Sequence, residues 1–578
     1  MPKIELYRSA LDGYIGEHLA NDVLEDQLSV AKAEVDEWED EDGLLKIELN
    51  DTNRPDLWST AGLGRQLRVY RGGDIPEYGF FSTDTETKDC GERIVQVDPG
   101  LKEIRPYIAA FVARGPAIDE ATLNDIIQTQ EKLCWNYGQK RRAVAMGIYR
   151  SDIMTFPVAY RAAEPDATSF VPLAEERSMS LRQMITDHPK GRDFGHIVAD
   201  FPRMPYLEDA AQEALSFPPV INSARLGAVE VGDSTLFIEL TGTDQHILHL
   251  ACSIVACDLA DAGFTIEPVR IEYPYDTPAG RTVVTPVYFQ TPIDIDSAFA
   301  SRWLGVSLTA DDCVRLLGRM GCRASGTGSS VRVQPPPYRN DFLHPVDVAE
   351  DIMIGYGMNN FEPSMLQDFT VGRLTPVEVL SREVKTVLVG LGFQEMVFNY
   401  LGSRRDYLDR MQPVPTDESQ ASDGNMVRIL NPMSENYEYV RPSVLPSLLS
   451  AEAVSAHAVY PHPVFEIGKV AVRDADSVSG TRTDDILGLV LSDVEATFNT
   501  IRDKVNTMLY FLNIDARYEA ATDSRFIPGR CAHILVDGAV VGVMGELHPQ
   551  VLENWGISMP TTAAELRVAS LIPQKSSL

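Results

Sequence analysis

The chain has 578 residues, 44% of them hydrophobic, a length that predicts about three or four domains with their own cores. No apolar run approaches the roughly 20 residues that span a bilayer, and the N-terminus lacks a basic region followed by an apolar one, so we expect a cytoplasmic protein without membrane contact. A net charge of −33 disfavours general attraction to nucleic acid, so any such contact has to come from local basic segments or a partner chain.

The seven cysteines are odd in number, scattered along the chain and never spaced as Cys-x-x-Cys. This spacing suits neither a disulfide framework nor a thiolate zinc site. We therefore expect reduced cysteines in the protein core.

The first half of the chain predicts an N-terminal module over residues 1–90, which closes in the polar loop 82–89, and then an α/β domain over residues 91–272. In the second of these, the apolar segment 107–114 predicts a strand and the segment 120–135 a helix. Short strands and helices then alternate up to about residue 270.

Within that domain, His246, His249 and Cys252 recur every three residues, as zinc ligands on a helix sometimes do. At 3.6 residues per turn each such step falls about 60° short of a full turn, so the three side chains fan over about 120° of the helix surface. Apolar residues surround all three. We predict a buried helix here and no zinc site.

Residues 273–362 predict a small α/β module. Thr309 and Asp312 have the spacing of a capping box at the start of a helix, and Gly321 follows the apolar stripe as a stop signal.

Residues 363–578 predict the last domain. It opens with a helix capped by Thr375 and ended by Gly392, followed by a strand over residues 393–400. The polar stretch 413–424 predicts a mobile surface loop.

Four carboxylates lie close together in the small module: Asp341, Asp347, Glu350 and Asp351. Pro345 suits the first position of a helix, on which the last three acids follow at i, i+3 and i+4 spacing, while Asp341 can fold back toward them. Oxygen donors without His or Cys suit a magnesium ion that keeps some of its waters. Alternatively, the macrodipole favours acids near a helix start without any metal. The spacing leaves both interpretations open.

The segment with these acids runs from Tyr-Arg-x-Asp at Tyr338 to Gly-Tyr-Gly at Gly357, and it resembles the phenylalanyl-tRNA synthetase β subunit. The resemblance covers nearly the whole chain, in the shorter form typical of archaeal and eukaryotic β subunits. Further matching segments follow one another in the expected order: 48–59, 431–434, 441–449, 464–470 and 545–549.

This resemblance implies an α+β multidomain fold with an N-terminal module, an α/β editing domain, a small metal-binding module and a class II synthetase-like antiparallel-sheet domain without catalytic motifs. The chain would be the β half of an α₂β₂ phenylalanine–tRNA ligase, which attaches phenylalanine to tRNA(Phe) with ATP only when paired with the α subunit. The four acids would hold Mg²⁺ shared with that subunit. Segments 530–538 and 541–549 lack the terminal Arg that adenylate chemistry needs, in agreement with a catalytically silent domain.

The resemblance also implies that the chain hydrolyses tyrosine wrongly attached to tRNA(Phe), because a pocket shaped for phenylalanine rejects an added hydroxyl poorly. By position, Leu207 would contact the ring, Ser216 and Thr241 would make polar contacts, and Glu239 would accept a hydrogen bond from the tyrosine hydroxyl. The family more often has Asp where Glu239 stands. The sequence offers no Ser/His/Asp or Cys/His constellation, so a positioned water and the substrate's own groups would carry out the hydrolysis.

Two basic segments are candidates for RNA contact. One is 140–142, beside Trp135 and Tyr137, and the other contains Lys190 and Arg192, which would meet the tRNA 3′ end. A solvated loop or turn is the alternative in both cases. For the whole chain, the competing hypotheses are a free-standing hydrolase of mischarged tRNA and a non-catalytic scaffold.

Overall fold

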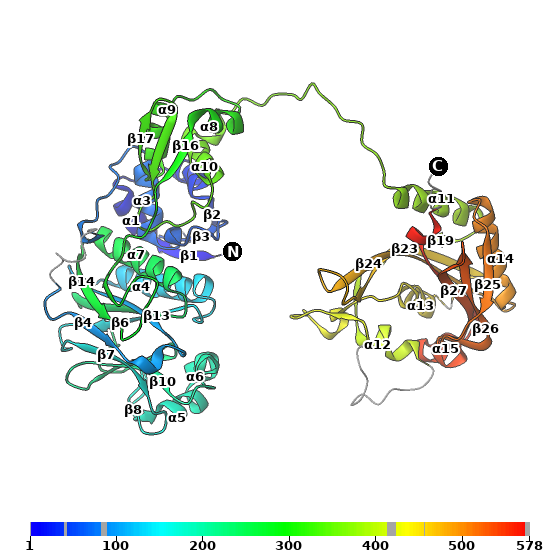
Figure 1. Ribbon diagram of the computed structural model, residues 1–578, viewed down its shortest axis with the longest axis horizontal. Helices are drawn as coiled ribbons and strands as arrows, with labels where there is room; N and C mark the ends of the chain where they lie inside the picture. Colours follow the sequence, from blue (N-terminus) through cyan, green and yellow to red (C-terminus); the bar gives the residue numbers. More distant parts are fainter. Residues whose placement is uncertain (1, 40–42, 82–89, 413–423, 456, 573–578) are drawn as a thin grey trace. The chain divides into compact units, whose positions relative to one another are not determined.

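The computed structural model describes all residues of the chain except 1, 40–42, 82–89, 413–423, 456 and 573–578. It forms two compact units, Met1–Ser364 and Met365–Leu578, each of which contains helices and sheets (Figure 1). The predicted loop 82–89 and nearly all of the predicted loop 413–424 lie outside the described residues. Within the described residues, no helix is long and apolar enough to cross a membrane.

The N-terminal module has an antiparallel sheet of strand order β1-β3-β2, with β1 at Lys3–Tyr7, β2 at Ala33–Glu39 and β3 at Leu44–Leu49. Buried and less buried residues alternate along β1 and β3, so each strand turns one face to the core. Three helices complete the module: α1 (Arg8–Ile15), α2 (Asn21–Leu28) and α3 (Thr60–Tyr70).

The α/β domain is built on a sheet of strand order β12-β11-β10-β7-β4-β14-β5-β13-β6, with β15 paired to β14. The bounds are β4 (Ile94–Val97), β5 (Tyr107–Arg114), β6 (Val144–Arg150), β7 (Val158–Ala163), β10 (Met204–Glu208), β11 (Ala214–Phe217), β12 (Ile221–Asn222), β13 (Thr235–Gly242), β14 (Thr265–Glu272) and β15 (Thr282–Thr285). The predicted strand 107–114 is confirmed, and the predicted helix appears as α4 (Glu120–Lys132), continued by a π-helical turn at Leu133–Tyr137. The predicted domain end at residue 272 falls between the paired strands β14 and β15.

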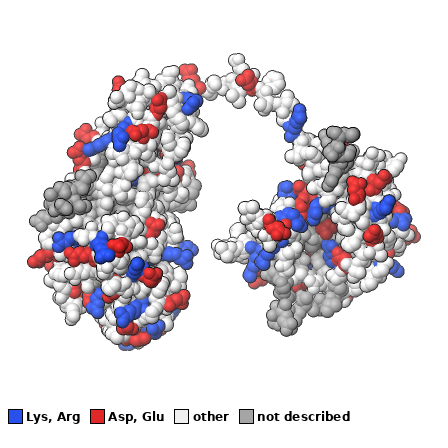
Figure 2. Space-filling model, in the orientation of Figure 1, with Lys and Arg blue, Asp and Glu red and all other residues white. Residues whose placement is uncertain are grey.

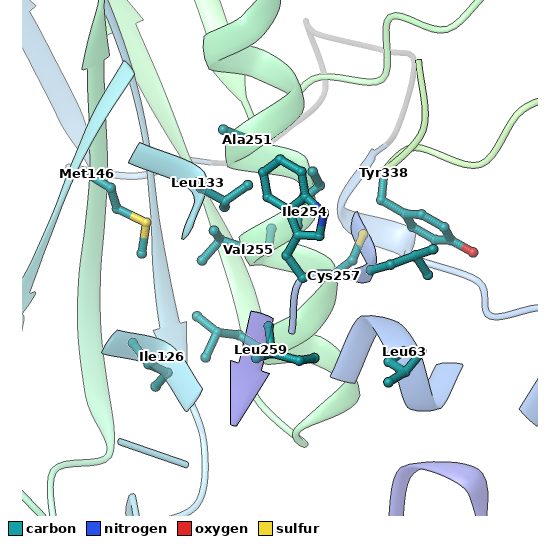
Figure 3. Packing of buried hydrophobic residues seen from close by; sticks show 14 of the residues in the cluster. Leu63, Ile126, Leu133, Met146, Ala251, Ile254, Val255, Cys257, Leu259 and Tyr338 are labelled. Atoms are coloured by element: carbon teal, nitrogen blue, oxygen red, sulfur yellow. The ribbon is translucent and has the colours of Figure 1, made fainter. Parts of the chain in front are cut away.

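Helix α7 (Gln245–Asp261) joins the N-terminal module to this domain through one shared core. Figure 3 shows its residues Ile254, Val255, Cys257 and Leu259 between Ile126 and Met146 on one side and Leu63 and Tyr338 on the other. The prediction of a buried helix at the His/His/Cys spacing is confirmed. All seven cysteines of the chain are buried, as predicted.

The side chains of strand β13 point alternately to the two faces of the sheet. Its residues Leu236, Ile238 and Leu240 belong to the core shared with α7, and Phe237 belongs to a second core on the other face. Since side chains alternate along a strand, Glu239 and Thr241 point to the same side as Phe237.

The small module has an antiparallel sheet of order β16-β18-β17 and three helices. Thr309 and Asp312 form the predicted capping box, Gly321 has the left-handed φ of +78° at the stop, and Pro345 opens a helix as predicted. The bounds are β16 (Ile293–Asp296), α8 (Ser297–Leu304), α9 (Ala310–Arg319), β17 (Arg323–Thr327), β18 (Ser330–Gln334) and α10 (Pro345–Tyr356).

The C-terminal unit has a sheet of order β19-β23-β24-β28-β27-β26-β25, antiparallel except for the pair β19 and β23. Helices α11 (Pro376–Gly390) and α14 (Phe498–Phe511) belong to one core of this unit, and α13 (Leu445–Val454) and α15 (Pro549–Trp555) to another. The strands are β19 (Gln394–Glu395), β23 (His462–Arg473), β24 (Thr481–Ser492), β25 (Ala516–Ala520), β26 (Phe526–Val536), β27 (Ala539–Leu547) and β28 (Thr561–Arg567).

Thr375 caps α11 as predicted. The predicted strand 393–400 is confirmed only at Gln394–Glu395, which forms β19 and pairs with β23, and is wrong for the other residues. Met396 still donates from its backbone N–H to the carbonyl of Phe465 at 2.8 Å, but the residues after it leave the ladder, and the side chains of Met396 and Phe398 pack against an apolar cluster. Their apolar alternation therefore reflects packing and not strand pairing.

Two of the matching segments meet in this unit through Arg441 and Glu466. The fully buried Arg441 donates through Nη2 to Glu466 Oε1 at 2.8 Å and through Nη1 to Oε2 at 3.0 Å. A side chain at Gly468 would overlap the guanidinium, so this close approach requires glycine.

Candidate functional site

A cavity of about 680 Å³ opens in the α/β domain, within the size range of small-molecule sites. Three of the four predicted pocket residues line it: Ser216, Glu239 and Thr241. The fourth, Leu207, lies opposite Ser216 in the β10–β11 pair but is fully buried in the core cluster with Phe237, away from the lining. The apolar wall comes from other residues, among them Ile126, Met146, Ile148, Phe217 and Val229.

Glu239 lies in the middle strand of three, with Ala110 of β5 on one side and Gly147 of β6 on the other. Both neighbours are small. A Cβ at Gly147 would overlap the Tyr149 hydroxyl and the Glu239 carboxylate, so these two groups occupy the space that a side chain would take. The register of β6 and β13 thus places Tyr149 next to Glu239.

The buried Tyr149 hydroxyl donates a hydrogen bond to Glu239 Oε1 at 2.8 Å. Burial raises the pKa of Glu239 from 4.5 to about 7, against the opposing effects of this hydrogen bond and of the Arg105 guanidinium. Burial and the neighbouring carboxylate also raise the pKa of Tyr149 well above its usual value, so this phenol stays protonated. Glu239 therefore changes charge near neutral pH.

Two buried polar atoms at the cavity have no hydrogen-bond partner among the described residues: Glu239 Oε2 and Ser216 Oγ. The Ser216 hydroxyl lies near enough to Tyr149 to influence the pKa of that phenol, yet without normal hydrogen-bond geometry. A buried acceptor without a donor costs about 1–3 kcal/mol. A ligand hydroxyl that donates to Glu239 would remove this cost.

Thr241 is held from behind by a buried arginine that the sequence reasoning missed. Arg105 Nε donates to Thr241 Oγ1 at 2.9 Å, and its Nη1 donates to the carbonyl of Arg142 at 3.0 Å. Tyr149 was missed as well. No local signal marks either residue, because the contacts of Arg105 are with residues distant in the sequence and the role of Tyr149 depends on the strand register.

Of the two basic segments, the structure brings Arg141 and Lys190 to the wall of the cavity. Arg192 is engaged otherwise, since it donates to the carbonyls of Thr186 and Asp187 at 3.4 and 3.3 Å.

The four predicted metal ligands, unlike Glu239 Oε2, all have partners within the protein. Arg339, buried beside them, contacts Asp341 and Asp351 at 2.6 Å each. Burial raises the pKa of Asp341, but Arg339 opposes this more strongly and holds it at about 2. For Asp351, burial outweighs Arg339 and raises the pKa. One guanidinium thus bridges two of the four acids.

The other two acids face other partners. Asp347 accepts hydrogen bonds from the backbone N–H groups of Leu343 and His344 at 2.7 Å, and Glu350 pairs with Lys32 at 2.7 Å. Among the described residues, no group of three or more His, Cys, Asp or Glu is placed to hold a metal ion. In this arrangement the four acids do not fit a magnesium ion, because Arg339 stands between two of them.

Two family models match the chain. The tRNA synthetase B5 domain matches residues 293–358, and the phenylalanyl tRNA synthetase beta chain CLM domain matches residues 364–568. These matches define the class of the protein as an aminoacyl-tRNA synthetase.

Relatives that match the whole length of the chain identify its family within this class. The phenylalanine–tRNA ligase beta subunit of Borrelia hermsii is 43% identical over 574 residues, and that of Treponema pallidum 44% over 612, each covering 99% of this chain and 100% of the relative. The chain therefore belongs to the family of phenylalanine–tRNA ligase beta subunits. A crystal structure of an N-terminal fragment of the Pyrococcus horikoshii β subunit is similar with a TM-score of 0.57 and 32% identity, over 62% of this chain and all of the fragment.

Proposed function

We propose that the cavity around Glu239 removes tyrosine from mischarged tRNA(Phe), and that the chain otherwise serves as the β half of a cytoplasmic α₂β₂ ligase that charges tRNA(Phe) with phenylalanine and ATP. The observation that carries the editing proposal is the unpartnered, buried Oε2 of Glu239 at a cavity of about 680 Å³. A tyrosine hydroxyl is a donor of the required kind.

The same atom explains why the site would discriminate against phenylalanine. A phenylalanyl ester in the cavity would leave Glu239 Oε2 buried without a donor, and sites built to bind a substrate hydroxyl reject the analogue without it strongly. Tyr149 keeps the other oxygen of Glu239 occupied, so a single acceptor faces the ligand. Hydrolysis would then use a water positioned beside the ester, with Ser216 and Thr241 as polar neighbours.

Ion pairs in the C-terminal unit support the proposal that this unit does not catalyse adenylate formation. Arg525 pairs with Asp523 and Glu565 at 2.7 and 2.9 Å, and Arg530 pairs with Glu546 at 2.5 Å. Each of these guanidinium groups is therefore already paired with a carboxylate. As the resemblance implies, ATP and phenylalanine would bind to the α subunit, and this unit would support assembly.

Arg339 contacts Asp341 and Asp351 at 2.6 Å each, so we derive no step through magnesium. A shared Mg²⁺ at Asp341, Asp347, Glu350 and Asp351 stays a prediction from the resemblance. We also propose the shorter archaeal and eukaryotic type of β subunit, supported by the full coverage of the archaeal fragment. The spirochaete relatives, which are bacterial, match this chain along their whole length.

The test uses the chain reconstituted with its α subunit and compares wild type with Glu239→Leu. Deacylation of Tyr-tRNA(Phe) should fall about a hundredfold or more, with phenylalanine charging unchanged, since the change removes the acceptor for the hydroxyl. Glu164→Leu, at an exposed ion pair with Arg203, is the matched control. Unchanged deacylation in Glu239→Leu would refute the assignment, and deacylation without any complex or charging would favour the free-standing hydrolase.

A further inference from the structure

The rim of the cavity carries two exposed cations beside two aromatic rings, brought together from segments far apart in the sequence. The rings of Trp135 and Phe194 lie edge to face, with centroids 6.3 Å apart. Lys140 Nζ lies 5.4 Å from the Trp135 ring centroid, and Lys190 Nζ lies 6.0 Å from that of Phe194. Phe194 is buried at the end of α6 (Pro189–Phe194), whereas the Trp135 side of the pair is open, with 52% of that residue exposed.

Arg141 fixes this arrangement to the cavity. Its guanidinium lies 4.0 Å from the Phe194 centroid and donates to the carbonyls of Pro219 and Val220 at 3.1 Å each. Arg141 and Lys190 are both part of the cavity wall. The two rings and the two lysines therefore lie next to the wall of the proposed tyrosine site and not on a remote surface.

The backbone before Arg141 is unusual, because three successive residues other than glycine are left-handed. Gln139, Lys140 and Arg141 have φ values of 52°, 56° and 68°. Such residues cost free energy and persist where the surroundings hold them in place. Here the N–H groups of Lys140 and Arg141 donate to the carbonyls of Trp135 and Cys134 at 2.8 Å each, which folds Lys140 back over the indole.

The two exposed cations at this rim have no acidic partner among the described residues. Neither Lys140 nor Lys190 makes an ion pair there, although the protein carries a net charge of −33 and many of its other basic side chains are paired. On the face drawn in Figure 2, acidic and basic side chains are mixed over both units. The nearby carboxylates Glu131 and Asp193 act on Arg141, which points inward.

We propose that Trp135, Lys140 and Lys190, here called the rim patch, bind the single-stranded 3′ end of an RNA and guide its aminoacyl end into the cavity. An exposed indole offers a face on which a base stacks, and the two lysines suit the phosphates on either side of it. This inference rests on the proposed function, because the bound RNA end would carry the ester that the cavity hydrolyses. The aromatic platform favours RNA over an acidic peptide, which would need only the charges.

The first experiment measures direct binding, so it does not depend on hydrolysis. A fluorescent single-stranded RNA of about six nucleotides ending in CCA is titrated with the full chain, wild type and Trp135→Ala, with Trp303→Ala, another exposed tryptophan, as matched control. Trp135→Ala should weaken binding about tenfold, within the range for loss of one stacked base, and Trp303→Ala should not. Equal affinity of Trp135→Ala and Trp303→Ala, or equally tight binding of a glutamate peptide of the same charge, would overturn the proposal.

The second experiment separates the rim patch from the cavity. Lys140→Ala should lower kcat/KM for Tyr-tRNA(Phe) by about fivefold and make it less sensitive to salt, while hydrolysis of 3′-O-tyrosyl-adenosine, which lacks the upstream phosphates, stays within about twofold of wild type, because Lys140 is not part of the cavity wall. An equal loss on both substrates would assign Lys140 to the cavity and refute the rim patch. If wild type hydrolyses neither substrate, the proposed function fails, and the binding result alone decides on the rim patch.

Discussion

Two sites with carboxylates were predicted in the N-terminal unit, one around Glu239 and one around Asp341 and Asp351, and their surroundings differ. At the cavity, Glu239 has one oxygen bound by Tyr149 and one without a donor. At the module boundary, Asp341 and Asp351 share Arg339, and Glu350 has Lys32. A carboxylate oxygen is available to a ligand when no donor of the protein binds it, and the residue type alone does not show whether a donor is present. Variants at the two sites test this difference.

The largest effect is expected from Arg339→Met, which leaves two buried carboxylates without their cation. Removing one partner of a buried ion pair costs roughly 3–5 kcal/mol of unfolding free energy. Denaturant unfolding of the full chain measures it. Arg323→Met, which breaks an exposed pair with Glu77, is the control and should cost under about 1 kcal/mol. Equal losses in both variants would contradict the structural role of Arg339. If Mg²⁺ raised the stability of Arg339→Met but not that of Arg323→Met, the acids around Arg339 would be able to bind the ion.

Glu239→Gln should change how stability depends on pH. The pKa of Glu239 is raised from 4.5 to about 7 on folding, so the folded state holds a proton that the unfolded state has released. The stabilisation by this proton is complete below about pH 4.5 and is lost as the pH rises to about 7, an effect of about 3 kcal/mol. Unfolding free energies at pH 4.5 and 8 should therefore differ less in Glu239→Gln than in wild type. Parallel curves would show that Glu239 ionises normally.

Tyr149→Phe should shift the pH at which deacylation of Tyr-tRNA(Phe) becomes half-maximal. The Tyr149 hydroxyl stabilises the ionised form of Glu239, so its removal should raise this midpoint above about 7, by on the order of one pH unit. Fold and phenylalanine charging should be unaffected. A lower rate with an unchanged midpoint would mean that Tyr149 acts through packing alone.

Asp347→Ala should have the smallest effect, a loss of about 1 kcal/mol of unfolding free energy. Asp347 accepts two backbone hydrogen bonds at the start of α10, and loss of such a cap costs about this much. Asp347→Asn retains an acceptor and should recover most of the loss. If Asn and Ala were equally damaging and the damage appeared only with Mg²⁺ present, a metal role would explain it better than the cap.

Local features were largely predictable because they depend on neighbouring residues alone. The capping box at Thr309, the proline at the start of α10 and the cap at Thr375 all appear as predicted. The spacing of Glu239 and Thr241 by two residues in a strand likewise put both on one face, where the cavity lies. The segment 393–400 shows the limit, since an apolar alternation cannot tell pairing from packing.

The sequence by itself determined the family, the starts of helices α9, α10 and α11 and three of the residues at the cavity, because motifs and periodicity are local properties of the chain. Only the tertiary structure decided that Tyr149 and Arg105 support Glu239 and Thr241, that Leu207 lies in the core, and that Arg339 pairs with two of the four acids predicted to bind magnesium. Each of these depends on strand register or on a partner distant in the sequence. Hydrogen bonds and ion pairs form at about 3 Å, and only the fold sets which groups reach that distance.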